Sequence, residues 1–504
     1  MRVAVTQGWH HCGMKTRPAR LLALALALAF TLPATAREAD DTASTDTEWM
    51  SVLLAGRKVG HARIDRQVGD DRVITRQRMH FELGRGGIEV AMSTDETHEE
   101  TPGGTPVAFT SVSRISGLEM RVEGRRIKAG DDRFAVKSGA AGSLRDSEMV
   151  LPTGALLAHG IERELRATGI SPGAHAELLM FQPLLQDAVR LRHEVVGPAT
   201  LDLPEGAVDL IEVRQTMAFP GGDMTSRAWV DAELQLQKMT MDVMGQELEL
   251  VACSQACAEA PNQPAEILTT SLVAAPRALT REERSGPVAI EVTSKHALQG
   301  WPGVDAQRLE SIGGGRHRIV ARHPDGGDPM ERPGDDDLAR TDWLDFDTPA
   351  VATLLQTDAD TGGDVQARML ALQQRVFDHI DNKSLRIGYA SAGDAARMRE
   401  GDCTEHALLL AAMGRSAGIP TRVVTGLAYS EDYGGGPNFV PHAWVAAWTG
   451  ERWQAFDAAL PGDDQLRIAF NADDGDPWRF YNGLDTLGTL SIDRIHALDA
   501  SDVD

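Results

Sequence analysis

Alternating apolar and polar positions run through most of the first half of the chain. Segments such as "RVITRQRMHFELG" and "GIEVAMSTDETHEE" change character at every second residue, and turn-forming runs such as "VGDD" and "TPGG" separate them. A period of two is typical of strands with one buried face, and short turns between such strands indicate hairpins. The pattern predicts a largely antiparallel β-rich domain over residues 45–262, in which residues 148–190 look more helical. The segment "EAPNQPAEI", with its prolines and asparagine, marks the end of this domain.

The next segment, residues 263–345, combines two strand candidates with a strongly acidic run. The strand candidates are "PVAIEVTSK" and "RHRIVARHP", and "DGGDPMERPGDDDLARTDW" follows them. Charge runs of this kind are usually solvated, so we interpret this segment as a short β segment followed by an acidic linker. His317 and His323 lie among arginines in the second strand candidate, and we expect both at the surface.

Residues 346–504 have a different pattern, in which helical periods precede strands. Apolar residues recur at helical spacing in "DVQARMLALQQRVFDHI", and a second helix is predicted through "TEHALLLAAMGRSAG", ending at Gly418 and Pro420. Strand patterns follow in "TRVVTGLAYS", "HAWVAAW" and "RWQAFDAA". The predicted fold class is therefore α+β, with a C-terminal domain of helices and strands preceded by a largely antiparallel β-rich domain.

The N-terminus has the three parts of an export signal. A basic stretch "MKTRPAR" precedes the apolar run "LLALALALAFTLP", and "ATA" provides a small-residue cleavage site. We interpret residues 1–36 as a signal peptide that is cleaved after Ala36, and expect a periplasmic or secreted protein. The apolar run is short for a membrane span, and no second run is long enough, so we expect no stable span in the mature chain.

Composition and charge exclude several classes of function. The 504 residues carry 74 acidic and 50 basic side chains, a net charge of -24. This charge repels phosphate backbones, which argues against nucleic-acid binding. The sequence shows no phosphate-binding glycine motif and no convincing metal-ligand spacing, so we expect neither a cofactor nor a metal.

The four cysteines fall into three groups. Cys12 lies in the signal peptide, and Cys253 and Cys257 are close enough in "CSQAC" to pair in an oxidising compartment. Cys403 is the odd cysteine, and an odd cysteine in an exported protein is either buried and inert or reactive.

The surroundings of Cys403 favour reactivity. Asp402 is positioned as the N-cap of the predicted helix, which puts Cys403 in the first turn, where backbone N–H groups and the helix dipole stabilise a thiolate. His442 opens the strand "HAWVAAW", and Asp457 lies near the end of the next strand. A tight turn makes these strands antiparallel neighbours, so His442 and Asp457 can face each other as base and orienting carboxylate. Taken singly, a core thiol, a structural histidine and a turn aspartate remain the alternatives.

Three motifs together resemble the core of the bacterial transglutaminase-like superfamily, relatives of papain-fold enzymes. They are "GDCTEHALLLAAMGRSAGIPTRVVTG", "HAWVAAW" and "RWQAFDAA". The resemblance implies a papain-like core with a Cys–His–Asp triad at Cys403, His442 and Asp457, and acyl transfer through a thioester. Ala446 stands where many relatives have an acidic residue and Ala458 where many have proline, which leaves the substrate side open.

We therefore expect an exported cysteine peptidase, amidase or acyltransferase of the transglutaminase-like class, acting on a peptide or protein substrate. Hydrolysis is favoured over cross-linking because water is always present and no amine-recognition feature is readable. The loop at 431–441 is expected to border the cleft, and the second oxyanion donor, beside the Cys403 N–H, is not assigned. The alternative is a non-catalytic periplasmic binding or scaffold module that uses the β-rich domain.

Overall fold

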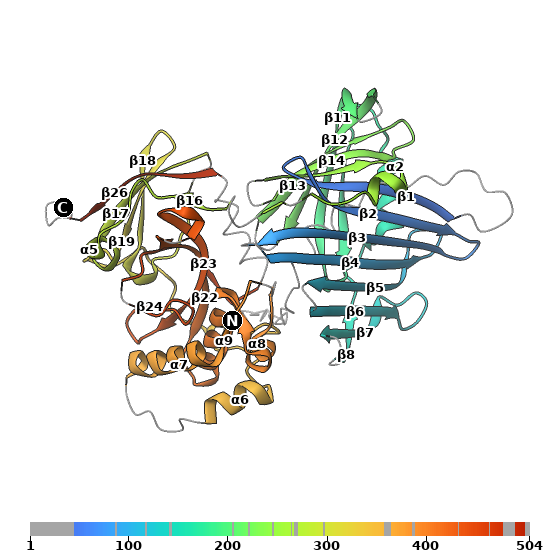
Figure 1. The fold of residues 1–504 in the computed structure, drawn as a ribbon. Coiled ribbons are helices and arrows are strands. Elements are labelled where there is room, and N and C mark those ends of the chain that lie inside the picture. Colours follow the sequence, from blue (N-terminus) through green and yellow to red (C-terminus); the bar gives the residue numbers. More distant parts are fainter. Residues whose placement is uncertain are drawn as a thin grey trace, which may run out of the picture.

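The structure is a computed structural model with a β-rich N-terminal part beside a C-terminal part of helices and sheets (Figure 1). The expected signal peptide and its cleavage site after Ala36 lie outside the described residues. Within the described residues, no helix has both the length and the apolar content needed to cross a membrane. The structure describes residues 45–498 apart from 86–87, 116–117, 141–143, 204–205, 220–221, 244–245, 264, 267–270, 296–297, 357–363, 386–388, 432, 463 and 477–488.

The N-terminal part is one fifteen-stranded sheet in the order β8-β7-β6-β5-β4-β3-β2-β1-β15-β14-β13-β12-β11-β10-β9. Neighbours are antiparallel except β9 and β10, as expected from the alternating pattern. The strands are β1 (Thr45–Leu54), β2 (Arg57–Val68), β3 (Val73–Arg85), β4 (Ile88–Glu100), β5 (Pro106–Ile115), β6 (Leu118–Arg126), β7 (Arg133–Ala140), β8 (Arg145–Val150), β9 (Ala155–Leu156), β10 (His175–Gln182), β11 (Asp187–Leu203), β12 (Gly206–Phe219), β13 (Gly222–Val230), β14 (Leu236–Val243) and β15 (Gln246–Ala252).

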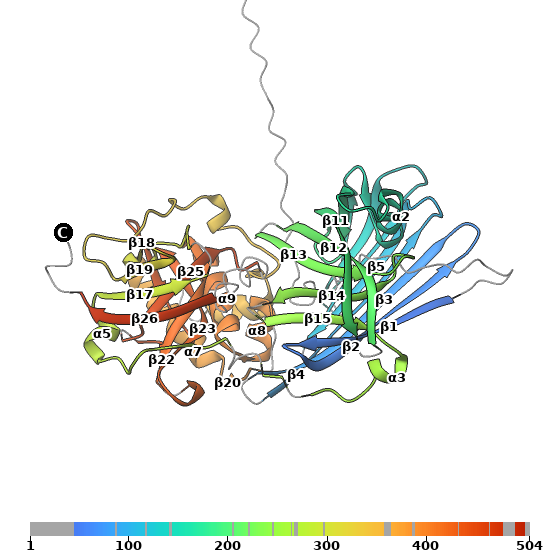
Figure 2. The same ribbon diagram turned by 90° about the horizontal axis from the view of Figure 1, so that it is seen from above.

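This long sheet bends back on itself around a shared apolar core (Figure 2). The inward residues come from alternate positions of each strand, for example Met50 and Val52 of β1. Phe109 of β5 and Phe181 of β10, from opposite halves of the sheet, pack with ring centroids 5.0 Å apart. The pairing of β1 with β15 joins the two halves, so one core stabilises the whole part.

The expected helical stretch at 148–190 is corrected by the structure. A helix, α2, spans Ala158–Thr168, whereas β9, β10 and the start of β11 occupy much of the remainder. Met180 and Phe181 explain the difference, because their apolar side chains are buried from a strand that pairs with β11. A short helix, α3 (Gln255–Ala258), follows β15.

Cys253 and Cys257 flank the start of α3 and are thiols in this structure. Their sulfur atoms lie 3.4 and 3.5 Å from the same hydroxyl oxygen, that of Ser51. Pairing of the two cysteines stays a prediction.

The C-terminal part contains two larger sheets. One has the order β16-β23-β22-β25, with β24 also paired to β23, and the other has the order β18-β19-β17-β26. β26, which follows the helices in the sequence, pairs with β17, which precedes α6 to α9. This sheet therefore joins segments from before and after these helices in the chain. The strands are β16 (Val273–Ala274), β17 (Val288–Ser294), β18 (Arg308–Gly313), β19 (Arg316–Ala321), β22 (Thr421–Ser430), β23 (Asn438–Trp448), β24 (Trp453–Phe456), β25 (Arg467–Asp473) and β26 (Leu490–Ala497).

Most helices of this part gather around α9, which covers the first sheet, whereas α5 contacts β26 of the second sheet. The central one, α9, packs against β22 and β23, and its apolar residues Leu408, Leu409 and Leu410 have no exposed surface. A two-stranded parallel pair, β20 and β21, leads into α9. The elements are α5 (Arg281–Ser285), α6 (Pro349–Gln356), α7 (Val365–His379), β20 (Asn382–Lys383), α8 (Ala392–Met398), β21 (Glu400–Gly401) and α9 (Cys403–Ser416).

The expectation of surface positions for His317 and His323 is wrong, because both are buried. β19 lies between β17 and β18, so the alternation of the strand puts His317 on the same buried face as Ile319. His323 is held by polar contacts, since its Nδ1 accepts a hydrogen bond from the Asp325 amide at 3.1 Å.

Candidate active site

Cys403 is the first residue of α9. Asp402 caps the helix by accepting a hydrogen bond from the Thr404 amide at 2.8 Å, and the Glu405 carboxylate accepts from the Asp402 amide at 3.0 Å. This reciprocal capping box fixes the first turn and leaves the positive end of the helix dipole at Cys403. A Cβ on Gly401 would lie 2.4 Å from Glu405 Cβ, so the chain enters the helix closely packed against this turn.

His442 and Asp457 are brought together by the hairpin of β23 and β24. The last register pair is Val445 with Phe456, which places Asp457 just beyond the strand end and diagonal to His442. His442 Nε2 lies 2.7 Å from Asp457 Oδ2, and both side chains are almost completely buried. The facing of these two side chains agrees with the geometry predicted from the tight turn.

Asp457 is held in its ionised form by several donors. Its Oδ1 accepts hydrogen bonds from the amides of Ala459 and Leu460 at 3.0 and 2.9 Å, and its Oδ2 accepts from Arg467 Nε at 2.8 Å. Burial acts to raise the pKa of Asp457, but the charges of His442 and Arg467 and the hydrogen bonds hold it well below its usual range. The Asp457 amide donates in turn to Gln373 Oε1 of α7 at 2.9 Å.

The hydrogen bond to Asp457 determines which imidazole nitrogen of His442 can act on a thiol. An ionised carboxylate only accepts, so Nε2 carries the proton of this bond and Nδ1 is the basic nitrogen. The indole of Trp444 stacks on the imidazole with centroids 5.9 Å apart and an interplanar angle of 20°. Because β23 packs against α9, the imidazole belongs to the strand that lies next to the helix of Cys403.

Two further polar residues near this site were not identified from the sequence. His406, one turn after Cys403, is buried, and its Nδ1 donates to the Asp402 carbonyl oxygen at 2.6 Å. Burial lowers the pKa of His406, and its Nε2 has no hydrogen-bond partner among the described residues. Lys383 pairs in register with Gly401 and lies over the ring of Phe377 at 3.9 Å, and burial lowers its pKa.

The sequence contained a signal for one of these residues. His406 follows Cys403 by three positions, which puts both on one side of a helix. Lys383 is brought close to the start of α9 by the parallel pairing of β20 with β21. Each of these strands has only two residues, which is too short for a recognisable sequence pattern.

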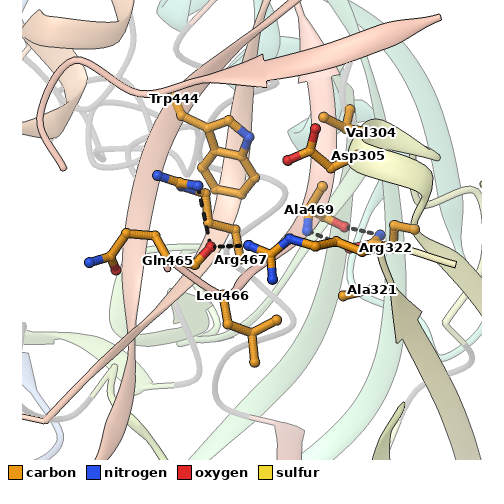
Figure 3. A pocket seen from close by; sticks show the side chains of 10 residues that line it. Val304, Asp305, Ala321, Arg322, Trp444, Gln465, Leu466, Arg467 and Ala469 are labelled. Atoms are coloured by element: carbon orange, nitrogen blue, oxygen red, sulfur yellow. Dashed lines mark hydrogen bonds between the residues drawn. The ribbon is translucent and has the colours of Figure 1, made fainter. Parts of the chain in front are cut away.

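The described residues contain no group of three or more His, Cys, Asp or Glu side chains arranged to hold a metal ion. A small cavity of about 20 Å³ lies behind Trp444, lined also by Arg467, Gln465 and Arg322 (Figure 3). It has the size of one water molecule and cannot take a substrate.

Comparison with known proteins assigns the region that carries these residues. The model of the transglutaminase-like superfamily matches residues 354–458, which include Cys403, His442 and Asp457. No curated protein matches the chain.

Two solved structures are similar to parts of the chain. A putative cysteine protease from Cytophaga hutchinsonii is 19% identical with a TM-score of 0.26, and the match covers 42% of this chain and 84% of that one. A β-barrel-like protein, a domain of unknown function from Brucella abortus, is 11% identical with a TM-score of 0.32, covering 42% of this chain and 96% of that one. The family match identifies residues 354–458, in the C-terminal part of this chain, as a transglutaminase-like superfamily domain.

Proposed function

We propose that the protein is an exported cysteine enzyme that transfers acyl groups from peptide or protein amides through a thioester, with hydrolysis favoured over cross-linking. One observation carries this proposal. A buried His442–Asp457 pair, joined at 2.7 Å, lies on a strand packed against the helix that begins with Cys403. This is the combination of nucleophile, base and orienting carboxylate that covalent acyl transfer needs.

In the proposed reaction, His442 Nδ1 takes the thiol proton of Cys403 and the thiolate attacks the amide carbonyl carbon. The Cys403 amide, at the helix N-terminus, donates to the developing oxyanion. The C–N bond then breaks, the imidazolium gives its proton to the leaving amine, and the acyl group stays on sulfur. Water, deprotonated by His442, cleaves the thioester and restores the thiol, whereas attack by an amine would give a cross-link.

A large cavity whose wall includes Ala390, which is hydrogen-bonded to the first turn of α9, is the proposed place of the substrate polypeptide. It has a volume of about 710 Å³ and lies between strands β6 to β8 of the N-terminal sheet and the region of α6 and α8. Its wall is bridged to the first turn of α9, because the Ala390 amide donates to Glu405 Oε1 at 2.9 Å and the other oxygen of Glu405 holds Asp402. The volume is in the usual range for ligand sites, about 300–1,000 Å³. The β-rich domain would then form one wall of the substrate site.

The reactivity of Cys403 tests the proposal. In the folded protein, we expect Cys403 to react with iodoacetamide at neutral pH faster than an ordinary thiol, and His442→Ala to slow the reaction by roughly 10²-fold or more. Cys257→Ser is the matched control, since Cys257 is exposed and lies in the other part of the molecule.

Labelling of Cys403 only after denaturation would contradict the enzyme and favour the non-catalytic binding or scaffold module. For a reactive Cys403, peptide libraries incubated with and without amine acceptors distinguish hydrolysis from cross-linking.

A further inference from the structure

Arg467 is the one charged residue besides His442 that contacts the Asp457 carboxylate in the described part of the chain. Its Nε and Nη2 both lie 2.8 Å from Asp457 Oδ2, the same oxygen that accepts from His442. The side chain is about nine-tenths buried. Its Nη2 also donates to the Leu460 carbonyl oxygen at 3.1 Å. Its Nη1 donates to the Gln465 carbonyl oxygen at 3.3 Å (Figure 3).

The position of Arg467 depends on a close approach between two strands. β25 begins at Arg467 and pairs with β22, where Gly426 is the register partner of both His442 and Ala469. A Cβ on Gly426 would lie 1.9 Å from the Ile468 carbonyl oxygen, so glycine is needed for β25 to pack this closely. This close approach places Arg467, the first residue of β25, where its guanidinium group reaches the carboxylate oxygen that also accepts from the imidazole.

The groups in the described part of the chain that act on Asp457 include four that are charged or titratable. His442 comes from β23 and Arg467 from β25, while Lys383 of β20 and His406 of α9 interact with it electrostatically. α7 contributes the neutral Gln373. Arg467 is the permanent cation in direct contact with the carboxylate, because an arginine stays protonated at all relevant pH values.

We propose that Arg467 is a positioning residue of this site, which fixes the Asp457 carboxylate against His442 and makes the His442–Asp457 pair take up its proton at lower pH. The role in catalysis rests on the proposed function, whereas the effect on the pair does not. A fixed positive charge opposes the binding of a proton to the groups beside it, so Arg467 favours the deprotonated state of the pair more than a neutral residue would. Hydrolysis of the thioester, which needs that state, would gain an acid-side working range.

The test follows the titration of the pair by NMR. In a Cys403→Ala background, which removes the thiol, the midpoint of the His442 imidazole titration should rise by about 1–2 pH units in Arg467→Gln. Arg467→Lys keeps the charge and should stay closer to the parent. Arg422→Gln is the matched control, since Arg422 pairs with Asp337, at 2.8 Å, and not with Asp457. An unchanged or lower midpoint in Arg467→Gln overturns the proposal.

If Arg467→Gln does not fold, a measurement on the Cys403→Ala protein with Arg467 intact tests the proposal instead. The NMR resonance of the Arg467 Nε–H should shift with the same midpoint as the His442 imidazole, because the two groups share one carboxylate oxygen. An Arg467 resonance that does not respond overturns the proposal. Alkylation of Cys403 in the wild type reports separately on the enzyme, so an unreactive thiol with a shifted midpoint contradicts the proposed function alone.

Discussion

Asp457 in the C-terminal sheet and Glu48 in the N-terminal sheet are both carboxylic acids turned toward a protein interior, yet their ionisation is opposite. The donors around Asp457 hold its pKa well below the usual range. Burial, aided by the nearby negative charges of Asp46 and Glu162, raises the pKa of Glu48 from 4.5 to about 8, and its buried Oε1 has no hydrogen-bond partner among the described residues.

The difference lies in the partners rather than in the depth. A cation is available near Glu48, since Arg66 acts to lower its pKa, but Arg66 is bound to Glu162 and to His159 Nδ1. Arg467, in contrast, directs two N–H groups at Asp457. A buried carboxylate stays ionised only when several hydrogen-bond donors point at it. Where the nearby donors bind other groups, as Arg66 does, the buried acid is neutral.

The largest expected effect comes from removing the charge of Asp457 itself. Asp457→Asn should lower turnover by roughly 10³–10⁴-fold, because an amide does not stabilise the imidazolium and can favour the wrong tautomer. The measurement is kcat with a peptide found in the library screen. Asp337→Asn, which alters a buried aspartate paired with Arg422, should keep most of the activity. If the turnover of Asp457→Asn stays within tenfold of the wild type, Asp457 does not have the proposed role of orienting His442.

The next effect concerns the close packing of β25 against β22 at Gly426, which positions Arg467. Gly426→Ala should lower the free energy of unfolding by about 2–4 kcal/mol, because the new methyl group overlaps the Ile468 carbonyl oxygen and the strands must separate. Urea unfolding measures this loss. Gly436→Ala is the control, since a Cβ there meets no atom within 4 Å. Equal stability of the two variants would show that β25 has room to move.

The contrast between these sites was only partly visible in the sequence. Alternation predicted the strands, and the tight turn predicted that His442 faces Asp457, because both depend on neighbours close in the chain. The pairing of β1 with β15 joins residues about 200 positions apart and leaves no local pattern. Arg467 lies in an ordinary strand segment, "LRIAFNAD", in which nothing indicates a contact with a carboxylate of the preceding hairpin.

The errors have the same physical origin. His317 lies among arginines, so its local composition favours the surface, but the sheet places it on an inner strand. Residues 148–190 contain enough helix formers to suggest a helix, while the need to cover the N-terminal core draws Met180 and Phe181 into a strand. Tertiary packing overrides local preference where the two disagree.

A smaller effect tests whether Glu48 is neutral in the folded protein. Glu48→Gln should raise the free energy of unfolding at about pH 8 by about 1–2 kcal/mol, which allows for the partial exposure of the side chain. The folded-state pKa lies above the unfolded value, so below pH 4.5 both states bind the proton and the variant has no advantage. As pH rises toward about 8, the unfolded state ionises first and wild-type stability falls, so the advantage of glutamine grows over this window.

Glu283→Gln tests the opposite situation, a carboxylic acid whose pKa is lowered in the folded protein. The side-chain hydrogen bonds from Arg277 lower the pKa of Glu283 to about 2 despite burial, so its charge stabilises the fold above the unfolded pKa and this contribution is lost as pH falls toward 2. Glutamine there should cost about 1 kcal/mol at neutral pH and nothing below the folded pKa. Unfolding curves of both variants across the pH range check the signs. A Glu48→Gln protein that is less stable at pH 8 would show that Glu48 is ionised, and that Arg66 serves two carboxylates at once.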